Sequence, residues 1–262
     1  MRENKVRTIV ANGGAVLNGW LGIPSSFSAE VMAHTGFDSL TIDMQHGAMH
    51  YDAAFPMLQA IATTDVTPLT RVPWNEPGII GKVLDAGSYG IICPMINNRE
   101  ETERLVRACK YPPVGSRSNG PTRARYYGGA DYATAANDTI LALAMVETAE
   151  AMNNLDDILS TPGLDGVYVG PADLSISLKN SMPPDVYGEE NLKAIKKIAE
   201  ACHKHGVIAG IHCMSVQHTV DMIGIGYQFC TVQSDTAFLA GQASAAVAEI
   251  RGNEAAATPK MY

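Results

Sequence analysis

The sequence lacks the features that mark membrane, exported and nucleic-acid-binding proteins. No apolar run reaches the length of about 18 residues that a transmembrane helix needs, and only a short apolar patch, Thr8 to Ala11, follows the N-terminus where a signal peptide would have its core. The 27 acidic residues outnumber the 19 Lys and Arg residues, whereas nucleic-acid-binding domains usually carry a basic face. We therefore expect a cytoplasmic protein that acts on small molecules, with neither nucleic acid nor membrane as a partner.

Motif spacings for disulfides, zinc and nucleotides are also missing. The five cysteines are widely spaced, with no CxxC pair, which indicates reduced thiols. No apolar run is followed by GxGxxG or by GxxxxGK[ST], so neither dinucleotide nor P-loop binding is expected.

What the chain does contain is a regular alternation of short apolar runs and helical patterns. The candidate strands are Leu17 to Ile23, Ser39 to Asp43, Thr67 to Arg71, Tyr89 to Cys93, Leu141 to Glu147, Gly166 to Val169, Val207 to Ile211 and Phe229 to Val232. The candidate helices are Ser28 to His34, Asp52 to Thr63, Gly78 to Asp85, Arg99 to Cys109, Ala149 to Leu159, Asn191 to His205, Val216 to Ile223 and Thr236 to Ile250. Continuous apolar strands separated by helices are typical of a parallel sheet buried on both faces.

The pattern predicts an α/β protein with a single (β/α)8 TIM barrel domain. A chain of 262 residues with 46% hydrophobic content fits one such domain, because these barrels commonly use about 200 to 250 residues. We assign residues 1–252 to the barrel and expect 253–262 to be a loose C-terminal tail. A doubly wound open sheet is the alternative architecture.

Two connections are too long to be simple turns: Lys110 to Asp138 and Ser177 to Glu190. Long connections in compact domains are usually functional or disordered. The first is rich in Gly, Pro and Arg, so we expect an ordered lid or a subunit contact. Its Arg117, Arg123 and Arg125 receive an acidic aldehyde or a neighbouring subunit, or are ordinary surface residues.

Polar side chains follow the predicted strands repeatedly, at the point where each strand ends. They are Asp43, Arg71, Glu147, Asp173 and His212. Catalytic groups of (β/α)8 barrels come from the carboxyl ends of the strands. The sequence therefore predicts an active site at this rim.

Glu147 and Asp173 follow consecutive strands and are the candidate metal ligands. A hard cation such as Mg²⁺ prefers oxygen ligands and commonly takes one or two protein carboxylates. The backbone N–H groups of Ala172 and Asp173, in the turn that begins at Gly170 and is stiffened by Pro171, are positioned to bind a carboxylate. The alternative is that each acidic residue only caps the helix that follows it.

His46 lies three residues after Asp43, so the two form a candidate acid/base pair, with Gln45 between them. A buried polar pair without a catalytic role is the alternative. Arg71 ends its strand where it can stabilise an oxyanion, or can form a structural salt bridge. Trp20, Gln45 and His212 are expected to line the pocket and contact the substrate, although Trp20 also fits a plain core position.

Five segments together resemble the class II pyruvate aldolases of the HpcH/HpaI family, which act on dihydroxyheptenedioate and 2-keto-3-deoxy sugar acids. The segments are Trp20 to Gly22, Ile42 to Gly47, Tyr111 to Arg117, Val146 to Thr148 and Val169 to Ser175. They occur in the family's order between about residues 17 and 250.

The resemblance implies reversible cleavage of a 4-hydroxy-2-keto acid to pyruvate, or a similar donor such as hydroxypyruvate, and an aldehyde. It implies a divalent metal (Mg²⁺, Mn²⁺ or Co²⁺) held by Glu147 and Asp173, with no Schiff-base lysine. Arg71 would bind the keto oxygen, Asp43 and His46 would form the acid/base pair, and Gly170 to Asp173 would hold the pyruvate carboxylate. The family also implies a homo-oligomer, a trimer or a hexamer with an exchanged C-terminal helix.

Gln45 departs from the family pattern, because many members that cleave the heptenedioate carry Glu before the histidine. The neutral amide removes one negative charge beside the site, so the metal preference and the identity of the acceptor aldehyde stay undetermined. Two other functions remain: a lyase of citramalyl or malyl thioesters, and a non-catalytic barrel that binds a metal or an oxyacid.

Overall fold

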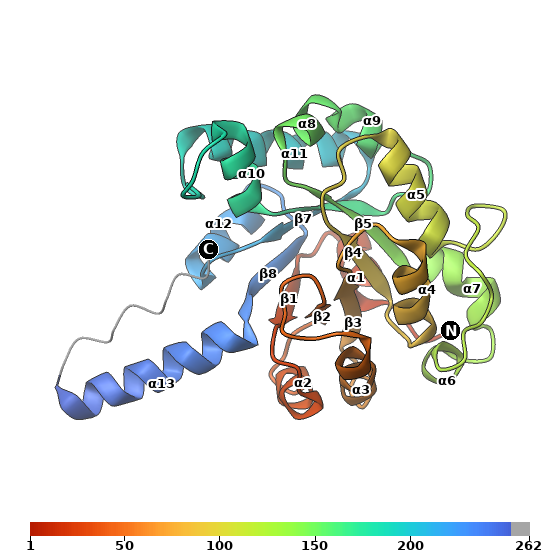
Figure 1. The fold of residues 1–262 in the computed structure, drawn as a ribbon, viewed down its shortest axis with the longest axis horizontal. Helices are drawn as coiled ribbons and strands as arrows, with labels where there is room; N and C mark the ends of the chain where they lie inside the picture. Colours follow the sequence, from red (N-terminus) through yellow and green to blue (C-terminus); the bar gives the residue numbers. More distant parts are fainter. Residues whose placement is uncertain (253–262) are drawn as a thin grey trace.

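A computed structural model describes residues 1–252, and the predicted loose tail, 253–262, lies outside the described residues. Eight parallel strands close into a barrel in sequence order (Figure 1). The strands are β1 (Val16–Leu21), β2 (Ser39–Asp43), β3 (Thr67–Arg71), β4 (Gly90–Cys93), β5 (Leu141–Val146), β6 (Gly166–Val169), β7 (Ile208–His212) and β8 (Phe229–Ser234). The predicted (β/α)8 barrel is confirmed, and the open sheet is wrong because β1 pairs with β8.

The helices around the barrel include all the predicted ones. They are α1 (Lys5–Ala11), α2 (Ser26–Ala33), α3 (Tyr51–Ile61), α4 (Pro77–Asp85), α5 (Arg99–Cys109), α6 (Ala124–Gly128), α7 (Tyr132–Thr139), α8 (Ala149–Asn153), α9 (Leu155–Leu159), α10 (Pro171–Lys179), α11 (Glu189–His205), α12 (Val216–Gly224) and α13 (Asp235–Arg251). The single helix predicted over Ala149 to Leu159 is two, because Asn154 leaves the helical conformation between α8 and α9. None of the helices within residues 1–252 has the length and apolar character needed to cross a membrane.

Each strand divides its side chains between two separate cores, because successive residues of a strand point to opposite faces. In β5, Leu143 and Met145 belong to the cluster inside the barrel, whereas Ala142 and Ala144 belong to the cluster beneath the helices. The same alternation places Tyr168 of β6 inside. Side chains two residues apart therefore form the layers that fill the barrel, and the last layer forms the rim.

Helix α1, which the sequence analysis did not predict, closes the amino end of the barrel. Val6 is fully buried and packs with Ile9 and Val10 against the inner cluster. The Asn4 side chain caps the helix by accepting the N–H of Val6 and donates to the Thr139 carbonyl at 2.8 Å. Only the carboxyl end of the barrel is left for a binding site.

The segment between α5 and β5 braces the same amino end, so the interpretation of it as a lid is wrong. Arg117 is buried and bonds Asp85, at the end of α4, at 2.6 Å and the hydroxyl of Tyr132 at 3.1 Å. Arg123 donates to the Leu58 carbonyl at the end of α3. Because α3 and α4 end where the next strands begin, Arg117 and Arg123 are structural and lie opposite the rim.

Helix α13 runs away from the barrel beyond β8 (Figure 1). It is rich in apolar residues, yet Leu239 is 65% exposed, Val247 48% and Ile250 86%. A 17-residue helix with so many uncovered apolar side chains is unusual for a monomer.

Candidate active site

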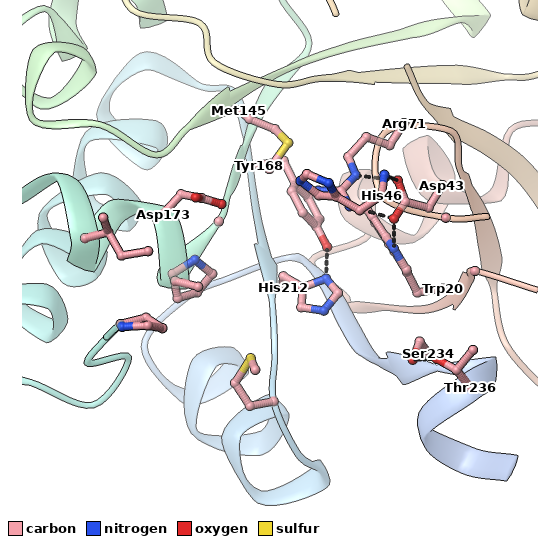
Figure 2. Close-up of a pocket in the computed structure, with 18 of the residues that line it drawn as sticks. Trp20, Asp43, His46, Arg71, Met145, Tyr168, Asp173, His212, Ser234 and Thr236 are labelled. Carbon is pink, nitrogen blue, oxygen red and sulfur yellow. Dashed lines mark hydrogen bonds and ion pairs between the residues drawn. The ribbon is translucent and has the colours of Figure 1, made fainter. Parts of the chain in front are cut away.

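A cavity of about 560 Å³ opens at the carboxyl ends of the strands. Most of the predicted site residues line it (Figure 2): Trp20, Asp43, His46, Arg71, Gly170, Pro171, Ala172, Asp173 and His212. Asp173 lies on one side of the cavity and Asp43, Arg71 and Trp20 on the other, with Tyr168 between them. Glu147 and Gln45 are outside the lining.

Asp43 and Arg71 form a two-pronged ion pair across the ends of β2 and β3. Arg71 donates from Nε to Oδ1 of Asp43 at 2.8 Å and from Nη2 to Oδ2 at 2.6 Å. The Trp20 indole donates to Oδ2 at 3.1 Å, and its ring lies 4.8 Å from the guanidinium carbon. These contacts fix the guanidinium in one orientation and leave Nη1 without a hydrogen-bond partner among residues 1–252.

The ion pair keeps both groups charged. Burial alone would raise the pKa of Asp43, but the hydrogen bonds and charge of Arg71 outweigh burial, so this pKa lies below its ordinary value. Burial likewise opposes the charge on Arg71, and Asp43 reverses the effect, so the pKa of Arg71 is raised. A permanent cation therefore stands at the rim.

Asp43 also holds the turn that carries His46. Its Oδ1 accepts the backbone N–H of Gln45 at 3.0 Å and that of His46 at 3.2 Å. The turn presents His46 at the cavity, whereas the side chain of Gln45 turns away and its Oε1 is buried without a partner among the described residues. Gln45, predicted to bind the substrate, is therefore not among the residues that line the cavity.

Glu147 lies directly behind the cavity wall. It is 2% exposed, and its Oε1 accepts the N–H of Met95 at 2.8 Å. Its Oε2 occupies the space beside Gly170, where an added Cβ would lie 2.4 Å away. Burial raises the pKa of Glu147 to about 7, the nearby negative charge of Asp173 adds to the rise, and the Met95 N–H and Arg71 oppose it.

The two carboxylates fit a divalent cation. The negative charge of Asp173 contributes to the raised pKa of Glu147, and Asp173 is exposed in the first turn of α10. No cluster of three or more His, Cys, Asp or Glu side chains suited to a metal occurs in residues 1–252. Two carboxylates with room for water and substrate suit Mg²⁺ or Mn²⁺, whereas zinc sites use more protein ligands.

The segment predicted as a turn at Gly170 to Asp173 is the start of a helix. Gly170 is the N-cap of α10, Pro171 occupies its first turn, and no side chain caps it. Its first N–H groups, at Ala172 and Asp173, therefore lack a partner within the helix and sit at its positive end. This is a ready binding site for a carboxylate.

Several lining residues were not found from the sequence. They are Gly22, Gly47, Ala48, Met145, Tyr168, Ile176, Met182, Pro184, Met214, Ser234 and Thr236. Alternation within the strands could have identified Met145 and Tyr168, since each lies two residues before a predicted site residue. No comparable signal exists for the loop residues Met182, Pro184 and Met214.

His212 packs on the aromatic wall of the cavity. Its ring meets Trp20 edge-on at 5.0 Å between ring centres, and Trp20 stacks on Tyr168 at 5.6 Å. Burial, assisted by the charge of Arg71, lowers the pKa of His212 to about 4. The imidazole is therefore neutral at physiological pH.

The fold and the rim together define a (β/α)8 barrel whose cavity is lined by Asp173 and by the ion pair of Asp43 and Arg71, with Glu147 behind the wall. The sequence matches the HpcH/HpaI aldolase/citrate lyase family model over residues 19–240, and the chain belongs to this family. It is 40% identical to a hydroxypyruvate/pyruvate aldolase of Rhizorhabdus wittichii, over 95% of this chain and 99% of that protein. It is 36% identical to a 4-hydroxy-2-oxo-heptane-1,7-dioate aldolase of Escherichia coli, over 99% and 100% of the two chains. A solved family protein from Burkholderia cenocepacia superposes with a TM-score of 0.88 at 29% identity, covering 95% and 99%.

Proposed function

We propose that the protein is a class II aldolase that cleaves a 4-hydroxy-2-oxo acid to an aldehyde and pyruvate or a pyruvate-like donor such as hydroxypyruvate. The proposal rests on how the side chains are arranged at the cavity. Asp173, the N-terminus of α10 and the fixed guanidinium of Arg71 meet at one cavity at the rim, and the carboxylate of Glu147 lies directly behind its wall. The names of the two relatives support the same reaction class.

Glu147 and Asp173 would hold the divalent cation, Mg²⁺, Mn²⁺ or Co²⁺. When bound, such an ion polarises the carbonyl group of the oxo acid and lowers the barrier to forming negative charge on its oxygen. The family relationship supports a metal, and the donor set favours a hard cation.

The side chains of this chain account for the remaining requirements of the reaction. The N–H groups at the start of α10 would bind the substrate carboxylate. His46 would take the proton from the C4 hydroxyl while the C3–C4 bond breaks, releasing the aldehyde and leaving the bonding electron pair on C3 and the C2 oxygen. Arg71, through Nη1, would donate to that oxygen, and C3 would then take up a proton to give the oxo acid.

The test is the release of pyruvate or hydroxypyruvate from a panel of 4-hydroxy-2-oxo acids with added Mg²⁺, Mn²⁺ or Co²⁺. Glu147→Ala is expected to lose this activity, because half of the carboxylate pair is gone. Solvent deuterium should enter the methyl group of pyruvate with the wild-type protein, which would exclude a purely binding role. Full cleavage in the presence of a chelator would contradict the proposed metal dependence. Turnover of CoA thioesters alone would favour the citramalyl- or malyl-thioester lyase.

We further propose that the protein works as a homo-oligomer, a trimer or a hexamer, in the cytoplasm. The apolar side chains left uncovered on α13 support assembly through this helix. All five cysteines carry free thiols, which fits a reducing compartment.

A further inference from the structure

A line of hydrogen-bonded side chains crosses the inside of the barrel and ends at His212. The hydroxyls of Ser39 and Thr41 lie 2.8 and 3.1 Å from Oδ1 of Asn18. Nδ2 of Asn18 lies 2.8 Å from the hydroxyl oxygen of Thr231. All of these side chains are fully buried, so each must find its partner within the protein.

The line continues from Thr231 to the cavity. The Thr231 hydroxyl lies 2.6 Å from that of Tyr168. The Tyr168 hydroxyl in turn lies 3.1 Å from Nδ1 of His212 (Figure 2). Gly210, two residues before His212, leaves the space for this arrangement, because a Cβ there would lie 3.1 Å from the Tyr168 ring. Tyr168 is therefore held between β7 and β8 with its hydroxyl aimed at the imidazole.

Counting the available protons decides which group donates in each hydrogen bond of this line. Ser39 and Thr41 have no acceptor other than Oδ1 of Asn18 among residues 1–252, so the Asn18 amide must present its N–H to Thr231. Thr231 then has one remaining acceptor, the oxygen of Tyr168, and Tyr168 must donate to Nδ1 of His212. The opposite direction would leave a buried hydroxyl proton of Thr231 without an acceptor, which is costly.

His212 consequently carries its only ring proton on Nε2. This atom has no hydrogen-bond partner among the described residues, and the ring lines the cavity. The lowered pKa of His212 agrees with a neutral ring that accepts at Nδ1. The lining near the end of β7 and β8 includes Met214 and the hydroxyls of Ser234 and Thr236, and a neutral N–H donor suits an uncharged oxygen such as a hydroxyl.

We infer that His212 uses Nε2–H to bind a hydroxyl group of the substrate, and that Tyr168 and Thr231 are positioning residues that fix its tautomer. This inference rests on the proposed aldolase reaction and names a substrate class for it, the hydroxylated reactants. A site that donates a hydrogen bond to a substrate hydroxyl disfavours the analogue that lacks it, because the donor is then left unpaired. The hydroxyl has two sources, C3 of the donor or C2 of the aldehyde.

The experiment compares His212→Phe with the wild type on two matched pairs, hydroxypyruvate against pyruvate and glycolaldehyde against acetaldehyde. Phenylalanine retains the ring packing against Trp20 but has no N–H. We expect kcat/KM to fall about tenfold for the hydroxylated member of one pair and less than twofold for its deoxy counterpart. The affected pair identifies the source, and His34→Phe, on the exposed end of α2, is the matched control that should change neither.

Long-range ¹H–¹⁵N NMR of the wild-type protein tests the tautomer without relying on activity. The expected spectrum is that of a neutral His212 with its proton on Nε2, and Tyr168→Phe should give a mixture of tautomers. A proton on Nδ1 in the wild type, or unchanged ratios in both substrate pairs for His212→Phe, would overturn the inference while the aldolase reaction stands. Failure of the wild type to turn over any 2-oxo acid would instead refute the proposed function.

Discussion

At the scale of single residues, the site depends on a few side chains whose orientation is fixed by more than one partner. Asp43 is the best example, because it accepts hydrogen bonds from Arg71, from the Trp20 indole and from the backbone of the turn that carries His46. The acid thereby aligns a cation and a candidate base at once. A residue with so many partners is expected to tolerate no substitution.

Gly170 is the residue whose replacement tests the carboxylate pair directly. In Gly170→Ala, the new Cβ would meet Oε2 of Glu147, so the carboxylate must move. We expect Mn²⁺ binding, measured by isothermal titration calorimetry, to weaken at least tenfold. Gly81→Ala in α4, where nothing lies within 4 Å of the new Cβ, is the control and should bind normally. Equal affinities in the two variants would show that Glu147 does not hold the ion.

His212 makes stability depend on pH in a predictable direction. Its pKa of about 4 in the folded protein lies below the ordinary value of 6.5, mainly through burial, with Arg71 and His218 lowering it further and Asp43 opposing them. The unfolded chain therefore binds the extra proton first, and stability is lost as the pH falls from 6.5 toward 4. Between pH 7 and pH 5 the wild type should lose about 2 kcal/mol that His212→Phe does not lose. Urea unfolding of both proteins at the two pH values measures the difference, and parallel losses would contradict it.

At the scale of elements, the strands and helices that repeat around the barrel were the best predicted from the sequence. Strands such as Ser39–Asp43 and Thr67–Arg71 were predicted to the residue, because a continuous apolar run bounded by polar residues has one interpretation in an α/β chain. The helices α1, α6, α7 and α10 were missed. Helix α6 has only five residues, and the periodicity of so short a segment does not distinguish a helix from a loop.

The candidate site was predictable to the extent that it follows strand ends. Asp43, Arg71 and Glu147 lie at or just beyond the last residue of a strand, so the fold alone brings them to the rim. Gln45, predicted to bind the substrate, does not line the cavity, because the turn after β2, and not the strand alternation, decides which side chains enter it. Met182 lies on a loop whose conformation depends on tertiary contacts, which no local pattern reports.

Arg117 tests the structural role of the segment between α5 and β5. Its buried guanidinium pairs with Asp85, whose pKa burial raises and Arg117 lowers. Arg117→Met leaves Asp85 without this partner, and we expect the free energy of unfolding to fall by about 2 to 4 kcal/mol. The kcat/KM for cleavage should remain within twofold, since the residue lies at the opposite end of the barrel. A large loss of kcat/KM with normal stability would restore the lid interpretation.

At the scale of the whole molecule, α13 is the feature that the single chain leaves incomplete. Helices such as α3 and α11 bury several apolar side chains, whereas Ala248 is the one buried apolar residue of α13, and Leu239 and Ile250 are exposed. Exposed apolar area of this kind marks an interaction surface.

The double variant Leu239→Asp and Ile250→Asp is expected to reduce the oligomer to smaller species. Two charges placed in an apolar interface cost more to bury than the contacts they replace contributed. Size-exclusion chromatography with light scattering measures the mass. Tyr126→Asp, an acidic substitution at an 89% exposed position on α6, is the control. An unchanged mass for the double variant would exclude α13 from the interface.

The division of each strand between an inner and an outer core has a consequence for how such a barrel changes over generations. Residues such as Asn18, Tyr168 and His212 share the inner face of their strands, while most adjoining positions belong to the outer cluster that includes the surrounding helices. Replacing the inward residues that line the cavity can therefore change substrate recognition while the outward positions and their packing against the helices stay the same. Substitutions at every second residue of a strand can therefore alter substrate preference while the packing of the surrounding helices is retained.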